Sequence, residues 1–358
     1  MENLIVFVFP FAISFCLVPL VKKIAWKLDI FAIENERSVH QGKIARIGGL
    51  AVYIAFIVCT TFFVKLDDSV RGILVGGFVV FIGGLIDDIY DLPPWAKLLF
   101  QCVGAACVMF IGDVYLLSLN LPYGLKINMS LLSILITFLW IIGLTNAINL
   151  IDGLDGLSSG FSLIVLFTIC VLTTLNNRPD VMVISLALAG ATAGFLLYNF
   201  HPASIFIGDC GAQFLGFMIA SISLLGFKGG TFITLAIPII LLFIPIMDTI
   251  IAILRRKLSG KRFTDADKNH LHHILMRTWQ LGQRETVLII YSITAMFGIA
   301  AYLYVIDEKV GLGVLAILIL ACEIFIEATG MISVKYRPIL GLIKRAKRLT
   351  MSDKEDKK

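Results

Sequence analysis

Long apolar runs alternate with short polar segments over residues 1–330 of the chain. A helix that crosses a membrane needs about 20 apolar residues, within a range of roughly 17 to 25. The pattern therefore predicts an all-α integral membrane protein with eleven spans, of which the fifth and the eighth are the least regular. In chain order the predicted spans are 3–21, 47–64, 72–86, 95–111, 131–144, 157–175, 181–197, 212–225, 232–253, 287–305 and 311–326.

The composition excludes the other common classes of protein. Of the 358 residues, 58% are hydrophobic and 15% are charged, whereas a soluble domain averages roughly 45–50% apolar and about 25% charged residues. One water-soluble core of this size lacks the polar surface to cover such an excess. We therefore exclude a soluble globular enzyme and a disordered protein, and we expect function to lie in the few polar segments.

The distribution of basic residues predicts how the chain is oriented. Lys22, Lys23 and Lys27 follow the first span, and basic residues collect on the cytoplasmic side of a membrane. With eleven spans, about four-fifths of the 30 Lys and Arg fall in alternate segments on that side. We predict a plasma-membrane protein with its N-terminus outside and its C-terminus in the cytoplasm. The predicted cytoplasmic segments are 22–46, 87–94, 145–156, 198–211, 254–286 and 327–358.

The chain is predicted to consist of one membrane domain and a C-terminal tail, with a short hairpin between two of the spans. Residues 1–330 form one membrane domain, and residues 331–358 form a basic cytoplasmic tail. Such a tail is typical of a solvated surface that helps to orient the spans. On the outer side, residues 114–130 contain Asn120, Pro122 and Gly124, and this composition predicts a short hairpin.

A first group of carboxylates ends the third span, in the run Gly-Gly-Leu-Ile-Asp87-Asp88-Ile-Tyr-Asp91. Residues three and four apart share a helix face, so Asp91 can meet both other acids if the helix continues. The helix dipole is negative at this end and disfavours carboxylates. A bound divalent cation would compensate the charge, and Mg²⁺ prefers carboxylate oxygens. For Asp91 alone, a solvated turn that caps the next helix is an equal interpretation.

A second polar group follows the fifth span and contains two amides and two carboxylates, Asn146, Asn149, Asp152 and Asp155. Two Asp-Gly pairs in this run predict tight turns, because glycine adopts positive φ without strain. The run contains no Lys or Arg, although a loop that only anchors a membrane protein is normally basic. These side chains therefore indicate a binding site, while Asp155 could instead cap the sixth span.

A third acid, Asp209, lies between glycines just before the predicted eighth span. For a lone aspartate, a helix cap is the favoured interpretation. Because three acidic groups occur on one predicted face of the membrane, we favour a shared site instead.

The largest predicted cytoplasmic loop carries the run His270-Leu-His272-His273 beside several basic residues. This run could bind a transition metal, but the hard carboxylates elsewhere and the lack of a neighbouring Cys favour contact with a phosphate-rich substrate. Asp248 lies within the ninth span, where an ionisable group is functional by default. A structural partnership with Arg255 is an equal interpretation for Asp248.

All these groups lie at the predicted cytoplasmic boundary of the membrane. A coupled transporter more often places its acids midway across the bilayer, beside broken helices. A boundary site with Mg²⁺, carboxylates, basic residues and imidazoles suits two phosphates, whose repulsion must be neutralised before one attacks the other. The residues thus favour phosphoryl transfer onto a lipid phosphate, with an ion-coupled transporter as the alternative from another class.

Four motifs occur in a fixed order: Asp-Asp-x-x-Asp, Asn-Ala-Ile-Asn-Leu-Ile-Asp-Gly-Leu-Asp-Gly-Leu, Gly-Asp-x-Gly and His-x-His-His. Over essentially the whole chain this resembles the polyprenyl-phosphate N-acetylhexosamine-1-phosphate transferases, in particular the Gram-positive branch that starts wall teichoic acid synthesis. The resemblance implies transfer of N-acetylglucosamine 1-phosphate from UDP-N-acetylglucosamine to undecaprenyl phosphate, with release of UMP. The related phospho-N-acetylmuramoyl-pentapeptide transferase of peptidoglycan synthesis is the alternative within the family.

The resemblance also implies partners and residue roles. The partners are the two substrates and the lipid bilayer; no nucleic acid is expected, and a homodimer is left open. Asp87, Asp88 and Asp209 match the catalytic acids, and the last two are the implied ligands of Mg²⁺, which Mn²⁺ could replace. The implied substrate-binding residues are Lys43, Asn149, Asp152, Asp155, His270, His272 and His273.

The chain departs from the family pattern at Ala45 and Ala212, where proline and serine are common. The first change leaves the role of Lys43 open, and neither change touches the carboxylates. In the implied mechanism the lipid phosphate attacks the sugar-bearing phosphorus, while Asp87 accepts a proton or orients that phosphate. A two-step route through an aspartyl intermediate is the rival.

Overall fold

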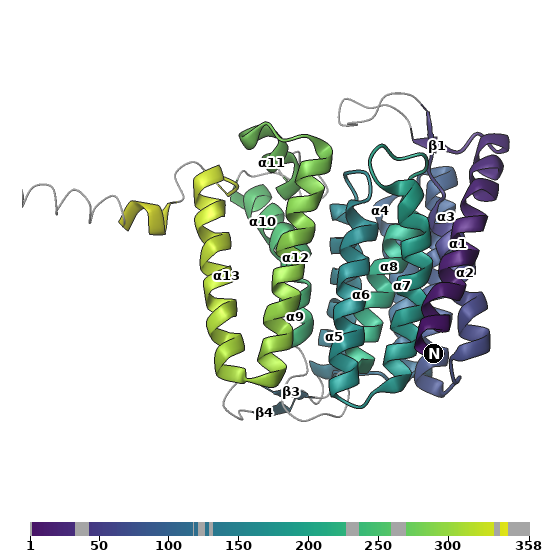
Figure 1. Cartoon of the computed structure of the whole chain (residues 1–358), viewed down its shortest axis with the longest axis horizontal. Coiled ribbons are helices and arrows are strands. Elements are labelled where there is room, and N and C mark those ends of the chain that lie inside the picture. Colours follow the sequence, from purple (N-terminus) through teal and green to yellow (C-terminus); the bar gives the residue numbers. More distant parts are fainter. Residues whose placement is uncertain are drawn as a thin grey trace, which may run out of the picture.

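The protein is a bundle of helices that run up and down beside one another (Figure 1). The structure, a computed structural model, describes residues 2–32, 43–116, 118–120, 126–128, 132–226, 236–258, 270–332 and 337–342. The predicted all-α membrane fold is confirmed. The helices are α1 (Glu2–Lys27), α2 (Gly49–Phe63), α3 (Asp68–Tyr90), α4 (Pro94–Ala106), α5 (Leu132–Ile151), α6 (Leu157–Leu175), α7 (Pro179–Asn199), α8 (Gly208–Gly226), α9 (Ala236–Leu241), α10 (Phe243–Leu258), α11 (Leu271–Trp279), α12 (Gln283–Ile306) and α13 (Glu308–Thr329), with a π-helical turn η1 (Cys107–Ile111) after α4.

Each predicted span coincides with a helical segment. Within the described residues, nine helices are long and apolar enough to cross a membrane, counting α4 together with η1. The second predicted span is the shorter α2, of 15 residues, and the ninth is divided into α9 and α10. Pro238 and Pro245 lie near that break, and proline removes a hydrogen-bond donor that a continuous helix needs. The count of eleven crossings and the N-outside orientation stay predictions.

Two predicted boundaries are wrong by about one helical turn. Asn146 and Asn149 belong to α5 rather than to a loop, because the Asn146 amide donates to the Ile142 carbonyl (2.8 Å) and is satisfied inside the helix. Asp209 lies in the first turn of α8 rather than before it, where the positive end of the helix dipole favours a carboxylate.

Helix α8 forms the centre of the bundle, and every residue of it except Asp209 is buried. It packs against α3 and α5, while α1 packs on α7 and α12 on both α6 and α13. Gly84 lets the end of α3 approach α8 closely, since a Cβ there would lie 2.6 Å from Cys210 Cα. Helix α13 is peripheral, and only Gly311, Ile326 and Glu327 in it are buried.

Two small hairpins mark opposite ends of the bundle (Figure 1). Strands β1 (Phe31–Ala32) and β2 (Ile44–Ala45) pair at the same end as α11. Strands β3 (Ser118–Asn120) and β4 (Lys126–Asn128) pair at the other end, which confirms the predicted hairpin. The polar motifs of α3, α8 and α11 therefore share one end of the molecule.

Candidate active site

The first acidic motif lies where α3 ends. Asp91 is the last residue of the turn and adopts a left-handed conformation with φ 48°, and Pro93 after it disfavours further helix. The Asp87 carboxylate closes the turn by accepting from Leu92 N–H (2.7 Å). The helix therefore ends before Asp91, and of the two interpretations of this residue the structure favours the turn. The Asp91 side chain is exposed and lies 3.4 Å from Arg46.

Asp88 ties the end of α3 to the start of α8. Its two carboxylate oxygens accept from the backbone N–H groups of Asp209 (2.8 Å) and Cys210 (2.9 Å). These groups have no partner within their own helix, and the dipole of α8 favours the negative charge. Gly208 allows this approach with φ 73°, since a Cβ there would lie 2.5 Å from Asp88 Oδ2. The positive start of α8 thus compensates an acid at the unfavourable end of α3.

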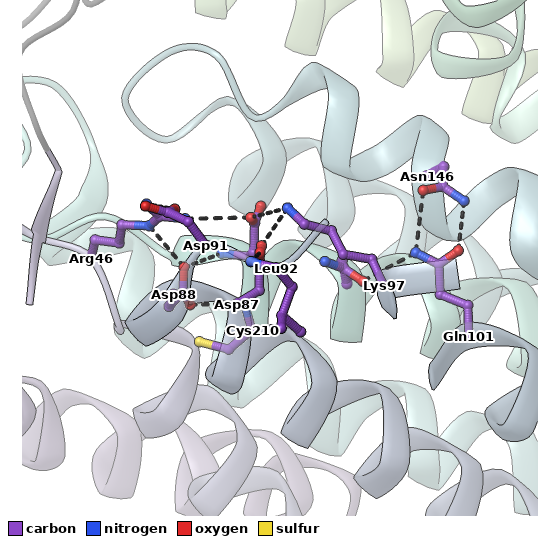
Figure 2. A network of polar contacts seen from close by, with 11 residues as sticks. Arg46, Asp87, Asp88, Asp91, Leu92, Lys97, Gln101, Asn146 and Cys210 are labelled. Atoms are coloured by element: carbon purple, nitrogen blue, oxygen red, sulfur yellow. Dashed lines mark hydrogen bonds and ion pairs between the residues drawn. The ribbon is translucent and has the colours of Figure 1, made fainter. Parts of the chain in front are cut away.

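Arg46 supplies a second compensating charge. Its Nε lies 2.9 Å from Asp88 Oδ1 and one terminal nitrogen lies 3.4 Å from Asp209 Oδ2 (Figure 2). Burial opposes the charge of Arg46, but the carboxylates of Asp88 and Asp209 outweigh it and raise its pKa. The backbone fixes the position of Arg46, because the neighbouring Ala45 carbonyl accepts from Phe206 N–H (2.8 Å).

Lys97, in the first turns of α4, supplies a third compensating charge. Its Nζ lies 2.5 Å from Asp87 Oδ2 and 3.1 Å from Asp209 Oδ2 (Figure 2). The positive start of a helix disfavours a cation, as the negative end of α3 disfavours carboxylates. Each unfavourable placement therefore compensates the other. We call Arg46, Asp87, Asp88, Lys97 and Asp209 the charged cluster.

A network of largely buried amides lies beside the charged cluster, and Figure 2 shows its members Gln101 and Asn146. Gln101 follows Lys97 by four residues on α4, and Gln213 follows Asp209 by four on α8. The Gln101 amide donates to Gln213 Oε1 (3.1 Å) and accepts from Asn146 Nδ2 (2.7 Å). The network joins α5 to α4 and α8, the helices that carry Lys97 and Asp209.

The loop after α5 holds Asp152 at the edge of the charged cluster. The backbone N–H of Asp152 donates to the carbonyl of Asn149 (3.2 Å), and its carboxylate accepts from the Ser158 hydroxyl (2.5 Å). Burial raises the pKa of Asp152 to about 7, although the Ser158 hydrogen bond lowers it, and the charges of Asp209 and Asp88 raise it further. The Asp152 carboxyl group therefore gives up its proton only near pH 7, beside the ion pairs of the charged cluster.

Asp155 closes the same loop against the segment that precedes α8. Its Oδ2 lies 2.8 Å from His201 Nδ1 and accepts from Ala203 N–H (3.0 Å). The residue at the start of α6 is Gly156, in a left-handed conformation with φ 76°. In the described structure Asp155 therefore connects two loops rather than capping α6.

The histidine motif, His270, His272 and His273, lies at the start of α11. His272 is buried, and its Nε2 has no hydrogen-bond partner among the described residues. That nitrogen faces Gly153 so closely that a Cβ there would collide with it. Burial lowers the pKa of His272 well below its usual value, and His273 and His270 add to the effect. The motif thus presents a neutral imidazole to the loop that contains Asp152.

Lys43 is the predicted site residue that lies apart from these groups. Its ammonium is exposed, lies 3.8 Å from Asp29 and stands 5.2 Å from the centre of the Phe31 ring. Three residues later, Arg46 enters the charged cluster instead.

A comparison with known proteins identifies the family of this chain. A protein of Bacillus subtilis (strain 168), named "Probable undecaprenyl-phosphate N-acetylglucosaminyl 1-phosphate transferase", is 38% identical over 352 residues, which cover 96% of this chain and 98% of the relative. The chain belongs to the polyprenyl-phosphate N-acetylhexosamine-1-phosphate transferase family. The predicted resemblance is confirmed. The model of glycosyl transferase family 4 also matches, over residues 70–227, which contain all of the charged cluster except Arg46.

More distant relatives share the family. The decaprenyl-phosphate N-acetylglucosaminephosphotransferase of Mycobacterium tuberculosis (strain ATCC 25618 / H37Rv) is 34% identical over 306 residues, 76% of this chain and 74% of the relative. The undecaprenyl-phosphate alpha-N-acetylglucosaminyl 1-phosphate transferase of Escherichia coli (strain K12) is 27% identical over 277 residues, 75% of each chain.

The charged cluster fits the hard divalent cation that the family resemblance implies. Among the described residues, no three His, Cys, Asp or Glu side chains converge as a complete metal site. Mg²⁺ does not require one, since it is usually bound by one or two carboxylates together with water and substrate phosphates. Asp87 and Asp209 already share one cation, the Lys97 ammonium. Their oxygens are the donors that such an ion prefers.

Sequence reasoning missed Arg46 and Lys97. A signal existed for Lys97, because a lysine three residues after Pro94 places a cation at the start of a helix, where the dipole disfavours it. The sequence offers no comparable signal for Arg46, whose position depends on a backbone pairing between segments far apart in the chain.

Proposed function

We propose that this protein transfers N-acetylglucosamine 1-phosphate from UDP-N-acetylglucosamine to undecaprenyl phosphate and releases UMP. The observation that best supports this function is the charged cluster, in which Asp87 and Asp209 both contact the Lys97 ammonium. The cluster lies at the end of the bundle that also holds the histidine motif. The similarity over nearly the full length to a relative named for this reaction supports the same activity.

The charged cluster would receive the phosphates. Asp209 and Asp87 would hold Mg²⁺, which when bound neutralises the charge between donor and acceptor. Asp88 is less available to a metal, because both its oxygens accept backbone N–H groups. Arg46 and Lys97 would bind phosphate oxygens of the two substrates. A phosphate monoester is largely dianionic at pH 7, so Asp87 can act by orienting the lipid phosphate rather than by removing a proton.

The loop of Asp152 and the histidine motif would bind the donor. A neutral His272, whose Nε2 has no hydrogen-bond partner among the described residues, can donate to a phosphate oxygen or accept from a sugar hydroxyl, depending on its tautomer. Asn149 and Asp155 border the same loop and would shape the nucleotide side. With the donor here and the lipid phosphate at the charged cluster, the attacking oxygen meets the sugar-bearing phosphorus between them.

The finer biological role follows from the same proposal. The product, undecaprenyl-diphospho-N-acetylglucosamine, would begin a cell-envelope glycopolymer. The resemblance of the sequence motifs to the Gram-positive branch of the family favours wall teichoic acid as that polymer. The distribution of basic residues along the chain supports a site on the cytoplasmic face of the plasma membrane. UDP-N-acetylglucosamine would therefore be drawn from the cytoplasm, and the lipid phosphate from the inner leaflet.

The test is release of UMP by the purified full-length protein with undecaprenyl phosphate and Mg²⁺. We expect turnover with UDP-N-acetylglucosamine, much less with the UDP-muramoyl-pentapeptide donor, and none after EDTA until Mg²⁺ is restored. Turnover with the pentapeptide donor alone would identify the peptidoglycan enzyme, and solute movement across vesicles without UMP release would identify a transporter. Isotope exchange between UMP and the donor in the absence of lipid would favour the two-step route.

A further inference from the structure

Asp248 is a buried carboxylate that the proposed reaction does not yet use. It lies on α10 and is only 1% exposed. Its Oδ2 lies 2.8 Å from His270 Nδ1, and its Oδ1 accepts from the backbone N–H of Leu271 (2.9 Å). Asp248 therefore holds His270, the first residue of the histidine motif. From the sequence, a functional role and a partnership with Arg255 were equal interpretations of Asp248.

The two hydrogen bonds have different consequences. Leu271 is the first residue of α11, and its N–H has no acceptor within that helix. Asp248 supplies the acceptor from another helix and places a negative charge at the favourable end of the α11 dipole. At His270, a carboxylate can only accept, so Nδ1 must carry a proton, and in the neutral ring Nε2 is then an acceptor.

Helix α11 transmits these constraints to the donor side of the site. His272 is the second residue of this helix and faces Gly153. The rings of His270 and His272 are parallel to within 5°, with centroids 6.1 Å apart. The far end of α11 is also anchored, because the Trp279 ring meets Phe325 of α13 edge-on at 5.3 Å. A change at Asp248 would therefore alter the histidine motif before it altered the charged cluster.

We propose that Asp248 is a positioning residue that fixes the tautomer of His270 and the start of α11, and thereby holds the histidine motif ready for the phosphates and sugar of the donor. The inference rests on the proposed function and deepens it. The expected effect is confined to the donor, because the lipid phosphate meets the charged cluster on α3, α4 and α8.

Two substitutions of Asp248 separate its two hydrogen bonds. Asp248→Asn keeps an oxygen for Leu271 N–H but turns an amide N–H₂ toward His270 Nδ1, which then must accept and shift its proton to Nε2. Asp248→Ala removes both bonds. We expect both variants to lose about 10- to 100-fold in kcat/KM for UDP-N-acetylglucosamine, by analogy with the loss of partners that orient metal-binding histidines. The KM for undecaprenyl phosphate should stay within about twofold.

Thr249→Val is the matched control. Thr249 follows Asp248 on α10, and its buried hydroxyl has no hydrogen-bond partner among the described residues. Replacing such a group by an apolar one of the same shape is nearly neutral, so kcat/KM should change by less than about twofold. The double variant of Asp248→Asn with His270→Gln should lose no more than the larger single loss, because coupled residues are not additive.

Other outcomes would overturn the inference. An Asp248→Asn variant as active as the wild type, beside an impaired Asp248→Ala, would reduce the role to capping α11. Equal losses with both substrates, in parallel with a lower melting temperature, would indicate a structural role only. Calorimetric binding of UDP to each variant separates this result from failure of the proposed function: a wild type that binds UDP without releasing UMP contradicts the function, while weaker UDP binding by Asp248→Asn still supports the positioning role.

Discussion

The charged cluster and the histidine motif lie at the same end of the bundle but are prepared for substrate in opposite ways. In the charged cluster, every carboxylate contacts a cation or a backbone N–H group within 3.4 Å. In the histidine motif, the buried Nε2 of His272 has no partner among the described residues. One half is satisfied before substrate arrives, and the other retains an unused hydrogen-bonding atom.

The difference indicates how each half would act. A site whose charges are already arranged pays little reorganisation when a phosphate arrives, and such preorganisation is the main source of electrostatic catalysis. Mg²⁺ would then compete with Lys97 and Arg46 for the carboxylates, and phosphate would compete with the carboxylates for these two cations. An unpartnered buried nitrogen instead gains a hydrogen bond when the donor binds, which favours specificity for the donor.

The largest effect is expected from neutralising one acid of the charged cluster. Asp87→Asn keeps the shape of the side chain but removes the charge that faces Lys97 Nζ. We expect kcat for UMP release to fall on the order of 10³-fold, the upper end of the range for loss of one preorganised electrostatic group in an active site, while the melting temperature is retained. Asp68→Asn, on the exposed opposite end of α3, is the control and should be fully active. Wild-type turnover in Asp87→Asn would remove the charged cluster from the mechanism.

Removing Lys97 tests whether this cation competes with a metal. In Lys97→Met the carboxylates of Asp87 and Asp209 lose the ammonium that they share. We expect kcat to fall about 10²-fold, as when one donor to a developing charge is lost, while half-maximal activity is reached at lower Mg²⁺. The measurement is a Mg²⁺ titration of UMP release, with the exposed Lys65→Met as control. A higher Mg²⁺ requirement in Lys97→Met would mean that Lys97 does not occupy the metal position.

The sequence predicted the fold well because the signal is physical and repeated. Apolar runs of membrane length fix where helices form, and each predicted span is helical. Errors arose where polar residues were taken as helix ends. Asn146 stays helical because Gln101 and the Ile142 carbonyl satisfy its amide. The local sequence pattern does not predict the contact with Gln101, which lies 45 residues away.

The sequence predicted which acids and histidines form the site, but it did not predict which residues contact one another there. The acids and histidines stand out because ionisable groups are rare in this chain, and the excess negative charge at the end of α3 correctly indicated a need for compensation. That compensation comes first from Arg46, Lys97 and the start of α8. Their contribution depends on how α4 and α8 approach α3, which a single sequence does not contain.

Arg46→Lys asks whether the charged cluster needs the shape of a guanidinium or only its charge. Arg46 reaches Asp88 and Asp209 with different nitrogens, whereas an ammonium is a point charge without this fork. We expect kcat/KM for undecaprenyl phosphate to fall about tenfold, which corresponds to about 1.4 kcal/mol. Arg178→Lys, which disturbs a comparable pair with Asp180 away from the site, should have no effect. An equal loss in both variants would argue against a specific role of the Arg46 fork.

Asp152 lies between the charged cluster and the histidine motif, and its substitution tests the pH dependence of stability rather than turnover. Its pKa is raised from 3.8 to about 7 in the folded protein, so between these values the folded chain keeps a proton that the unfolded chain has lost. The stability that this proton contributes is complete below about pH 4 and is lost as pH rises through about 7. Asp152→Asn stays neutral at every pH. Its melting temperature should therefore exceed that of the wild type by a margin that grows from pH 4 to pH 7 and then levels off, at up to about 4 kcal/mol or about 5 °C for a chain of this length. A margin that shrinks with rising pH would show that Asp152 is stabilised as an anion, by cations that lie near its carboxylate.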